Sequence, residues 1–298
     1  MTETTSGRPK PRPLEHLPEG WRVVRLWGAG LFATHAILER SDGARVEWSS
    51  RRHRKSLGLL PSDRRRADTK GGWGRPSSTS CWLGALFGLG SLCFALGSIP
   101  LYFDNVDSDI LAGTFFGGSV LFTMAGYLQF HETLAAPDGV LVDSPRPRRL
   151  RALLGWQPRA IDWWAGFVQL VGTVSFNIST FAATREDLSG EQERHLIWAP
   201  DVGGSICFLV ASWLAYSEVN RGIRPRPDRS VGWRIAALNL GGSIAFGAAA
   251  VGARYVGSSG APANVTLVNL GTFVGAVCFL LGAGLLPVES AKDSAPAQ

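Results

Sequence analysis

Six apolar stretches of this chain contain the same short pattern: a Gly, then a small residue, with a Phe four positions after the Gly. The six glycines are Gly90, Gly118, Gly172, Gly204, Gly242 and Gly275. In every second stretch a Glu follows the Phe by ten residues, which gives Glu132, Glu218 and Glu289. Self-similarity of this kind marks internal repetition, so the pattern predicts three copies of one two-helix unit whose glycines serve close helix packing.

The six stretches are long enough to cross a bilayer, and we place them at residues 82–103, 110–130, 163–183, 198–216, 233–256 and 265–286. A spanning helix needs about 20 mostly apolar residues, and charged residues occur here only near the ends of the stretches. The sequence therefore predicts an all-α integral membrane protein. Its six transmembrane helices would form three parallel two-helix repeats, at residues 81–132, 161–218 and 231–289, around a pseudo-threefold axis.

Basic residues gather in every second connection. Before Trp82 there are 16 Lys and Arg residues, and the connections 133–160 and 219–230 are rich in Arg, whereas the connections between them are acidic or lack basic residues. Since cytoplasmic loops carry an excess of Lys and Arg, both termini, including the tail 290–298, are predicted to face the cytoplasm.

The basic segment before the first span is expected to meet membrane lipids. Each Lys or Arg near an anionic surface contributes about 1 kcal/mol of attraction. Lipid contact is therefore predicted for Arg51, Arg52, Arg54, Lys55, Arg64, Arg65 and Arg66. No nucleic-acid recognition motif is present, so the net charge of +6 is assigned to lipid or to a protein partner. No oligomeric state follows from the sequence.

The region before the membrane divides into three parts. Residues 1–20 have the polar, proline-rich composition of a disordered tail. Within 21–60, two alternating runs flank Ser41-Asp42-Gly43, a hairpin turn signal. We expect a small cytoplasmic β-hairpin region there, preceded by a short helix or strand across 23–32, that leans on the membrane or on the helix ends. Residues 61–80 are predicted to be a basic linker.

Few polar side chains occur at depth in the spans. They are the amides Gln169, Asn239, Asn177 and Asn269. Interhelical hydrogen bonds would make them structural, at about 0.6–2 kcal/mol each; the alternative is a polar site. Glu132, Glu218 and Glu289 would form a ring at the cytoplasmic helix ends. It would pair with loop arginines or, alternatively, select cations as a vestibule.

Catalytic chemistry is not indicated. No Walker A loop, HExxH or GxSxG pattern occurs, and the four Cys residues lack ligand spacing. No cofactor, metal centre or enzymatic activity is predicted. Asp104, Asp107 and Asp109 could hold Ca²⁺ loosely, but a solvated outer loop is the favoured interpretation.

The two-helix unit resembles the YrhK-like membrane domain, a small bacterial family. The resemblance lies in Trp82-Leu-Gly-Ala-Leu-Phe-Gly-Leu-Gly-Ser-Leu-Cys-Phe94, followed by Gly117-Gly-Ser-Val-Leu-Phe122. It implies a bacterial membrane protein without an assigned activity.

Two functions follow as hypotheses. The first is a non-enzymatic multi-pass protein of the cell membrane whose basic cytoplasmic face binds anionic lipid or a partner. The second is a small pore or facilitator for a neutral or cationic solute, with Gln169 and Asn239 on its path.

Overall fold

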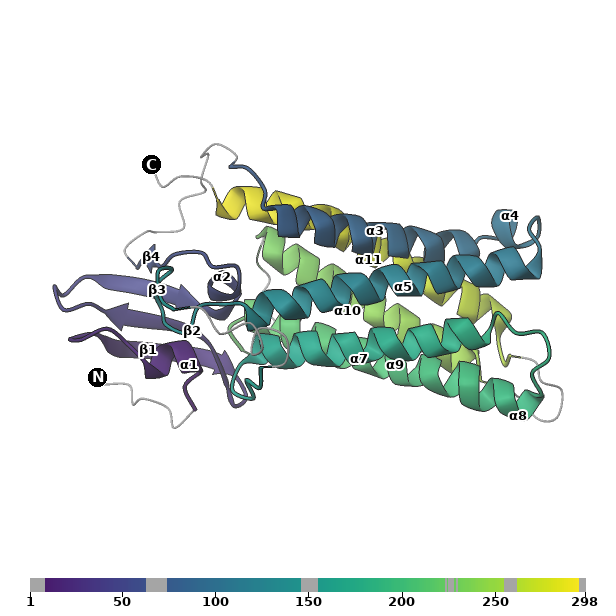
Figure 1. Cartoon of the computed structure of the whole chain (residues 1–298), viewed down its shortest axis with the longest axis horizontal. Helices are drawn as coiled ribbons and strands as arrows, with labels where there is room; N and C mark the ends of the chain where they lie inside the picture. Colours follow the sequence, from purple (N-terminus) through teal and green to yellow (C-terminus); the bar gives the residue numbers. More distant parts are fainter. Residues whose placement is uncertain are drawn as a thin grey trace.

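The computed structural model describes residues 9–62, 74–145, 155–222, 224, 228, 230–254 and 262–294. A small antiparallel sheet at one end is followed by a bundle of long helices (Figure 1). Six helices of the described part are long and apolar enough to span a membrane, so the chain is a multi-pass membrane protein with the predicted fold class. They are α3 (Ser78–Gly97), α5 (Ser108–Leu134), α7 (Ile161–Ala182), α9 (Ala199–Val219), α10 (Val231–Gly252) and α11 (Val265–Asp293).

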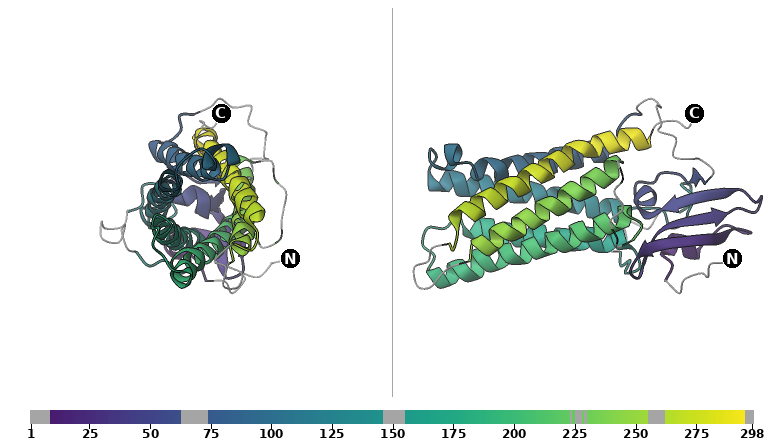
Figure 2. Two further views of the ribbon diagram at one scale, coloured as in Figure 1. Left: turned by 90° about the vertical axis from the view of Figure 1, so that its right-hand side faces the viewer. Right: turned by 180° about the vertical axis from the view of Figure 1, so that it is seen from behind.

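The six helices form a closed ring. Each packs against the next in the chain, and α11 packs against α3. Figure 2 shows this ring end-on in its left view. The ends of α5, α9 and α11 and the starts of α3, α7 and α10 lie on the side where the sheet docks (Figure 1). The described ends of the predicted basic connections therefore lie at that one end of the bundle.

The cassette glycines set the close contact within each helix pair. A Cβ on Gly90 would lie 3.0 Å from the carbonyl oxygen of Gly118, and one on Gly118 would lie 3.1 Å from that of Gly90. The pairs Gly172/Gly204 and Gly242/Gly275 show the same reciprocal approach, at 3.0–3.2 Å. Small residues allow helix backbones to approach in this way. Descent of the three pairs from one repeated unit remains a prediction.

Six phenyl rings fill the axis of the bundle. Phe94, Phe176 and Phe246 contact one another with centroids 6.0–6.5 Å apart. The other three cassette rings, Phe122, Phe208 and Phe279, do the same at 5.6–6.1 Å. All six are buried, and most of their contacts are edge-to-face, the arrangement aromatic rings prefer. This phenyl layer leaves an apolar barrier across the middle of the ring.

The N-terminal sheet is larger than the predicted hairpin. β1 (Arg22–Ala29), β2 (Phe32–Glu39), β3 (Arg45–Ser49) and β4 (Leu60–Pro61) are antiparallel in the order β1-β2-β3-β4. The predicted hairpin is confirmed as β2–β3, with Gly43 in its turn at φ +80°. Of the two alternatives predicted for residues 23–32, a short helix or a strand, the strand is correct, since β1 covers most of that segment.

Part of the predicted disordered tail is ordered. α1 (Arg12–Glu15) lies against the sheet, and its Leu14 is buried with Leu38, Trp48 and Val140. Val140 comes from the connection between α5 and α7, so this core joins three distant segments. The tail was misjudged because its single core residue stands among polar and proline residues, with no periodicity to reveal it.

The predicted spans differ from the helices mainly at their ends. The first was placed at 82–103, but α3 ends at Gly97, and α4 (Pro100–Phe103) is a separate turn. Pro100 lacks the N–H that a continuing helix needs and disfavours helical geometry at the residue before it. The segment before α9 contains α8 (Gly190–Glu193) and a π-helical turn, η1 (Arg194–Trp198).

Candidate functional site

A short basic helix connects the sheet to the mouth of the bundle. α2 (Ser50–Arg54) begins directly after β3, where the Ser49 hydroxyl accepts a hydrogen bond from the backbone N–H of Arg52. It lies between the sheet and the helix ends (Figure 1) and contacts α7 and α9. The short strand β3 thus places α2 and the following Lys55 over the ring of helices.

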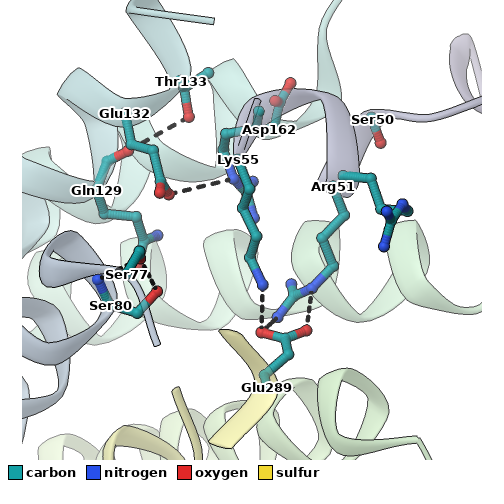
Figure 3. Close-up of polar contacts among 12 residues, drawn as sticks. Ser50, Arg51, Lys55, Ser77, Ser80, Gln129, Glu132, Thr133, Asp162 and Glu289 are labelled. Carbon is teal, nitrogen blue, oxygen red and sulfur yellow. Dashed lines mark hydrogen bonds and ion pairs between the residues drawn. The ribbon is translucent and has the colours of Figure 1, made fainter. Parts of the chain in front are cut away.

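Two cations of this segment, Arg51 and Lys55, form ion pairs with Glu289 of α11. The Arg51 guanidinium donates from Nε and Nη2 to the two carboxylate oxygens of Glu289, at 2.7 and 2.9 Å, and the ammonium of Lys55 lies 2.8 Å from the same carboxylate (Figure 3). Lys55 also donates to Asp293 at 3.2 Å. The Glu289 side chain is only 7% exposed. Charge-assisted, bidentate pairs of this kind are the strong ones.

The third cation of the segment lies between the other two glutamates. Arg54 is 3.9 Å from the Glu132 carboxylate and 3.8 Å from that of Glu218. Within the described residues its buried Nε has no hydrogen-bond partner. Glu218 also accepts a hydrogen bond from the Ser50 hydroxyl. We call this set of ion pairs between residues 50–55 and the three glutamates the latch.

The latch bears on two predictions. The three glutamates of the predicted ring do converge, and among the described residues they pair with residues 50–55. The described loop arginines Arg159 and Arg221 pair instead with Glu15 and Glu47. Lipid contact was expected for Arg51, Arg54 and Lys55; their side chains are instead 18%, 11% and 13% exposed and face carboxylates. A buried carboxylate attracts these cations more strongly than a lipid headgroup at the surface would, because less water screens the charges. Arg52 lies 3.8 Å from Asp293, and Arg64, Arg65 and Arg66 lie outside the described residues.

Further contacts hold the sheet on the bundle. His53 makes a 2.9 Å hydrogen bond through Nε2 with the carbonyl oxygen of Pro137, and Arg221 donates to Glu47 of β3 at 2.6 Å. Burial lowers the pKa of His53, and the Pro137 carbonyl only partly opposes this. Burial also disfavours the charged form of Arg51, but Glu289 outweighs it and raises the pKa of Arg51. The arginine therefore stays charged inside the latch.

A chamber with both polar and apolar lining lies inside the bundle beneath α2. Its volume is about 80 Å³. The residues that carry its chemistry are Gln129, Gln169, Asn239, Glu132, Arg54 and Glu289, while Phe87 and Phe279 close the end toward the phenyl layer. The Gln129 side-chain N–H donates to the Gln169 carbonyl oxygen at 3.3 Å. The chamber is thus bounded by the phenyl layer on one side and by the latch on the other.

The structure separates the four predicted amides. Gln169 and Asn239 both line the chamber. Asn177 instead bridges α5 and α7, where it accepts from the Ser119 hydroxyl at 2.6 Å and donates to that of Thr123 at 2.7 Å. Asn269 is half-buried on α11 and is not among the chamber residues. Of the four, the first two fit the predicted polar site, and Asn177 fits the alternative of structural hydrogen bonding.

Gln129 is the chamber residue that the sequence analysis missed. It lies three residues before Glu132 on α5, so both side chains share one helix face. The spacing from Glu132 is the sequence feature that could have identified Gln129 as a member of the site. No group of His, Cys, Asp or Glu side chains in the described segments is arranged to hold a metal ion. The four cysteines are present as free thiols.

Comparison with known proteins gives no relative: no protein-family model, curated protein or solved structure matches the chain.

Proposed function

We propose that the chain is a non-enzymatic multi-pass protein of the bacterial cell membrane, with both termini in the cytoplasm, whose basic cytoplasmic face binds anionic lipid. The observation that carries this proposal is that the sheet and the described ends of the basic connections lie at one end of the ring. A single face that is rich in Lys and Arg is what the cytoplasmic surface of a membrane protein presents. The YrhK-like resemblance of the two-helix unit agrees with this proposal.

The lipid-binding residues of this proposal lie outside the latch. Because the cations of residues 51–55 already pair with carboxylates, they contribute little free charge to the surface. The linker cluster Arg64, Arg65 and Arg66 forms a run of three positive charges, with single acidic residues at Asp63 and Asp68 and a further cation at Lys70. Each of these residues would contribute on the order of 1 kcal/mol at an anionic surface.

The test compares two triple variants of the full-length protein in detergent, titrated with phosphatidylglycerol and followed by native mass spectrometry. Replacing Arg64, Arg65 and Arg66 with Gln should weaken lipid retention by up to roughly 100-fold, since about 3 kcal/mol is removed. The control replaces Arg22, Arg40 and Arg45 with Gln. These three are 74%, 48% and 56% exposed on the sheet and should leave retention unchanged. Equal retention by both variants would contradict the proposal.

The chamber favours a second candidate, a facilitator for a small solute. Its amides, Gln169 and Asn239, lie on the side of the phenyl layer that faces the sheet, so a solute would have to pass that layer. The candidate predicts that Gln169→Leu with Asn239→Leu abolishes solute flux into proteoliposomes. Wild-type protein that gives no flux above empty liposomes would leave lipid binding as the sole function proposed.

A further inference from the structure

We propose that the chamber beneath α2 is a binding site for one neutral polar molecule of a few heavy atoms, in the class of small amides and polyols. This goes beyond lipid binding. It rests on the same chamber as the facilitator candidate but requires no passage across the membrane.

Charge balance around the chamber favours a neutral occupant. Arg51, Arg54 and Lys55 bring three positive charges to the lining of the chamber, and the three carboxylates of Glu132, Glu218 and Glu289 pair with them. An ion that entered would lose its hydration without gaining an unpaired counter-charge. Such transfer is costly. A neutral polar molecule avoids this cost.

Unused hydrogen-bonding capacity faces the same space. Among the described residues, no hydrogen bond joins the side-chain amide of Asn239 to another group, although this residue lines the chamber. The contact between Gln129 and Gln169 is long at 3.3 Å and leaves most of both amides free. The buried Nε of Arg54 lacks an acceptor. The burial of the Arg54 Nε–H without a partner is costly; an acceptor atom of a bound molecule would satisfy it, and the other polar atoms of the molecule would meet the three half-buried amides.

Volume limits the size of the occupant. A space of about 80 Å³ is well below the 300–1,000 Å³ or so of drug-sized pockets. It admits a few water molecules, or one solute of roughly four to six heavy atoms. Acetamide and glycerol meet this limit, whereas a disaccharide does not.

Occupancy is linked to the latch because Arg51, Arg54 and Lys55 line the chamber. A ligand that contacts these side chains binds the docked state of α2 and not the state in which α2 has lifted from the glutamates. By linkage, such a ligand slows the opening of α2 by a factor of 1 + [L]/Kd, about tenfold at ten times Kd.

Amide hydrogen exchange of residues 50–55 in the full-length protein in nanodiscs tests the proposal. Acetamide or glycerol, titrated into the millimolar range, should slow exchange in a saturable manner, whereas sucrose should not. Gln169→Leu with Asn239→Leu should abolish the effect. Asn269→Leu, which replaces an amide outside the chamber, should preserve it.

Three outcomes would overturn the inference: no saturable protection by either probe, equal protection by sucrose, or equal protection of the double variant. The comparison of probes on wild-type protein decides the matter even if the double variant fails to fold. A chamber that holds only water gives no protection. Protection without flux in proteoliposomes would leave the binding site standing while the facilitator candidate fails, and neither result bears on lipid retention.

Discussion

The replacement Glu289→Gln should release α2 from the bundle. Glu289 accepts two hydrogen bonds from Arg51 and lies 2.8 Å from the Lys55 ammonium, with a side chain that is 7% exposed. Gln preserves the shape of the side chain but removes its charge. Two largely buried cations then face an amide that cannot neutralise them.

The magnitude follows from the burial of the group. Breaking a buried ion pair by removing one partner costs about 3–5 kcal/mol, because a charge stays buried without compensation. Lys55 keeps its contact with Asp293 at 3.2 Å, so we expect the lower end of this range. About 3 kcal/mol corresponds to an opening equilibrium shifted roughly 100-fold.

Hydrogen exchange of residues 50–55 in nanodiscs measures this shift directly. The matched control is Asp293→Asn, which removes a charge that is 29% exposed and lies beside the latch, 3.2 Å from Lys55 and 3.8 Å from Arg52. Partly exposed pairs of this kind contribute below about 1 kcal/mol. Adding Arg51→Gln to Glu289→Gln removes both charges, so the double variant should exchange more slowly than the sum of the two single effects predicts. If Glu289→Gln exchanged no faster than Asp293→Asn, the latch would not hold α2 and the reasoning would be refuted.

Three further predictions concern pH and packing. Burial lowers the pKa of His53 below its ordinary value of 6.5, so the undocked segment binds more protons. Docking should then be fully stable above pH 6.5 and weaken as pH falls through the folded pKa; exchange of α2, corrected for intrinsic rates, should show this and lose it in His53→Gln. Gly118→Ala should lower the free energy of unfolding by about 1–3 kcal/mol, because the new Cβ would lie 2.8 Å from that of Cys93. The control is the neighbouring Gly117→Ala, whose Cβ would meet nothing within 4 Å and which should leave thermal unfolding unchanged. Phe94→Ala with Phe122→Ala should open the phenyl layer and let proteoliposomes leak a small solute; intact vesicles would show that these rings are not the barrier.

The six spans were predictable because their signal is local. Apolar length alone marks a membrane helix, and the hairpin was marked by one turn sequence. The sequence patterns did not reveal the helix ends set by single residues, as at Pro100, or β4, a strand of two residues that is too short to show a pattern. Leu14 shows the limit: its burial depends on Leu38 and Val140, which no window of neighbouring sequence contains.

The candidate site was harder to predict because it depends on pairs of distant residues. The glutamates and the basic segment were both recognised, but Arg51 and Glu289 are 238 positions apart. Charge count alone could not choose between a lipid headgroup and an internal carboxylate as the partner of Arg51. The internal carboxylate is the partner because β3 ends beside the ring of helices and places α2 against the helix ends.

This arrangement also bears on the two kinds of solute proposed for a facilitator. A cation that sought the glutamate ring would compete with Arg51, Arg54 and Lys55, which are tethered to the same chain. The guanidinium of Arg51 already donates two hydrogen bonds to Glu289, a bidentate geometry that a hydrated metal cation lacks. A neutral solute does not compete for the carboxylates at all. It can bind the amides while the ion pairs of the latch stay formed. The neutral class is therefore the one that the closed latch favours.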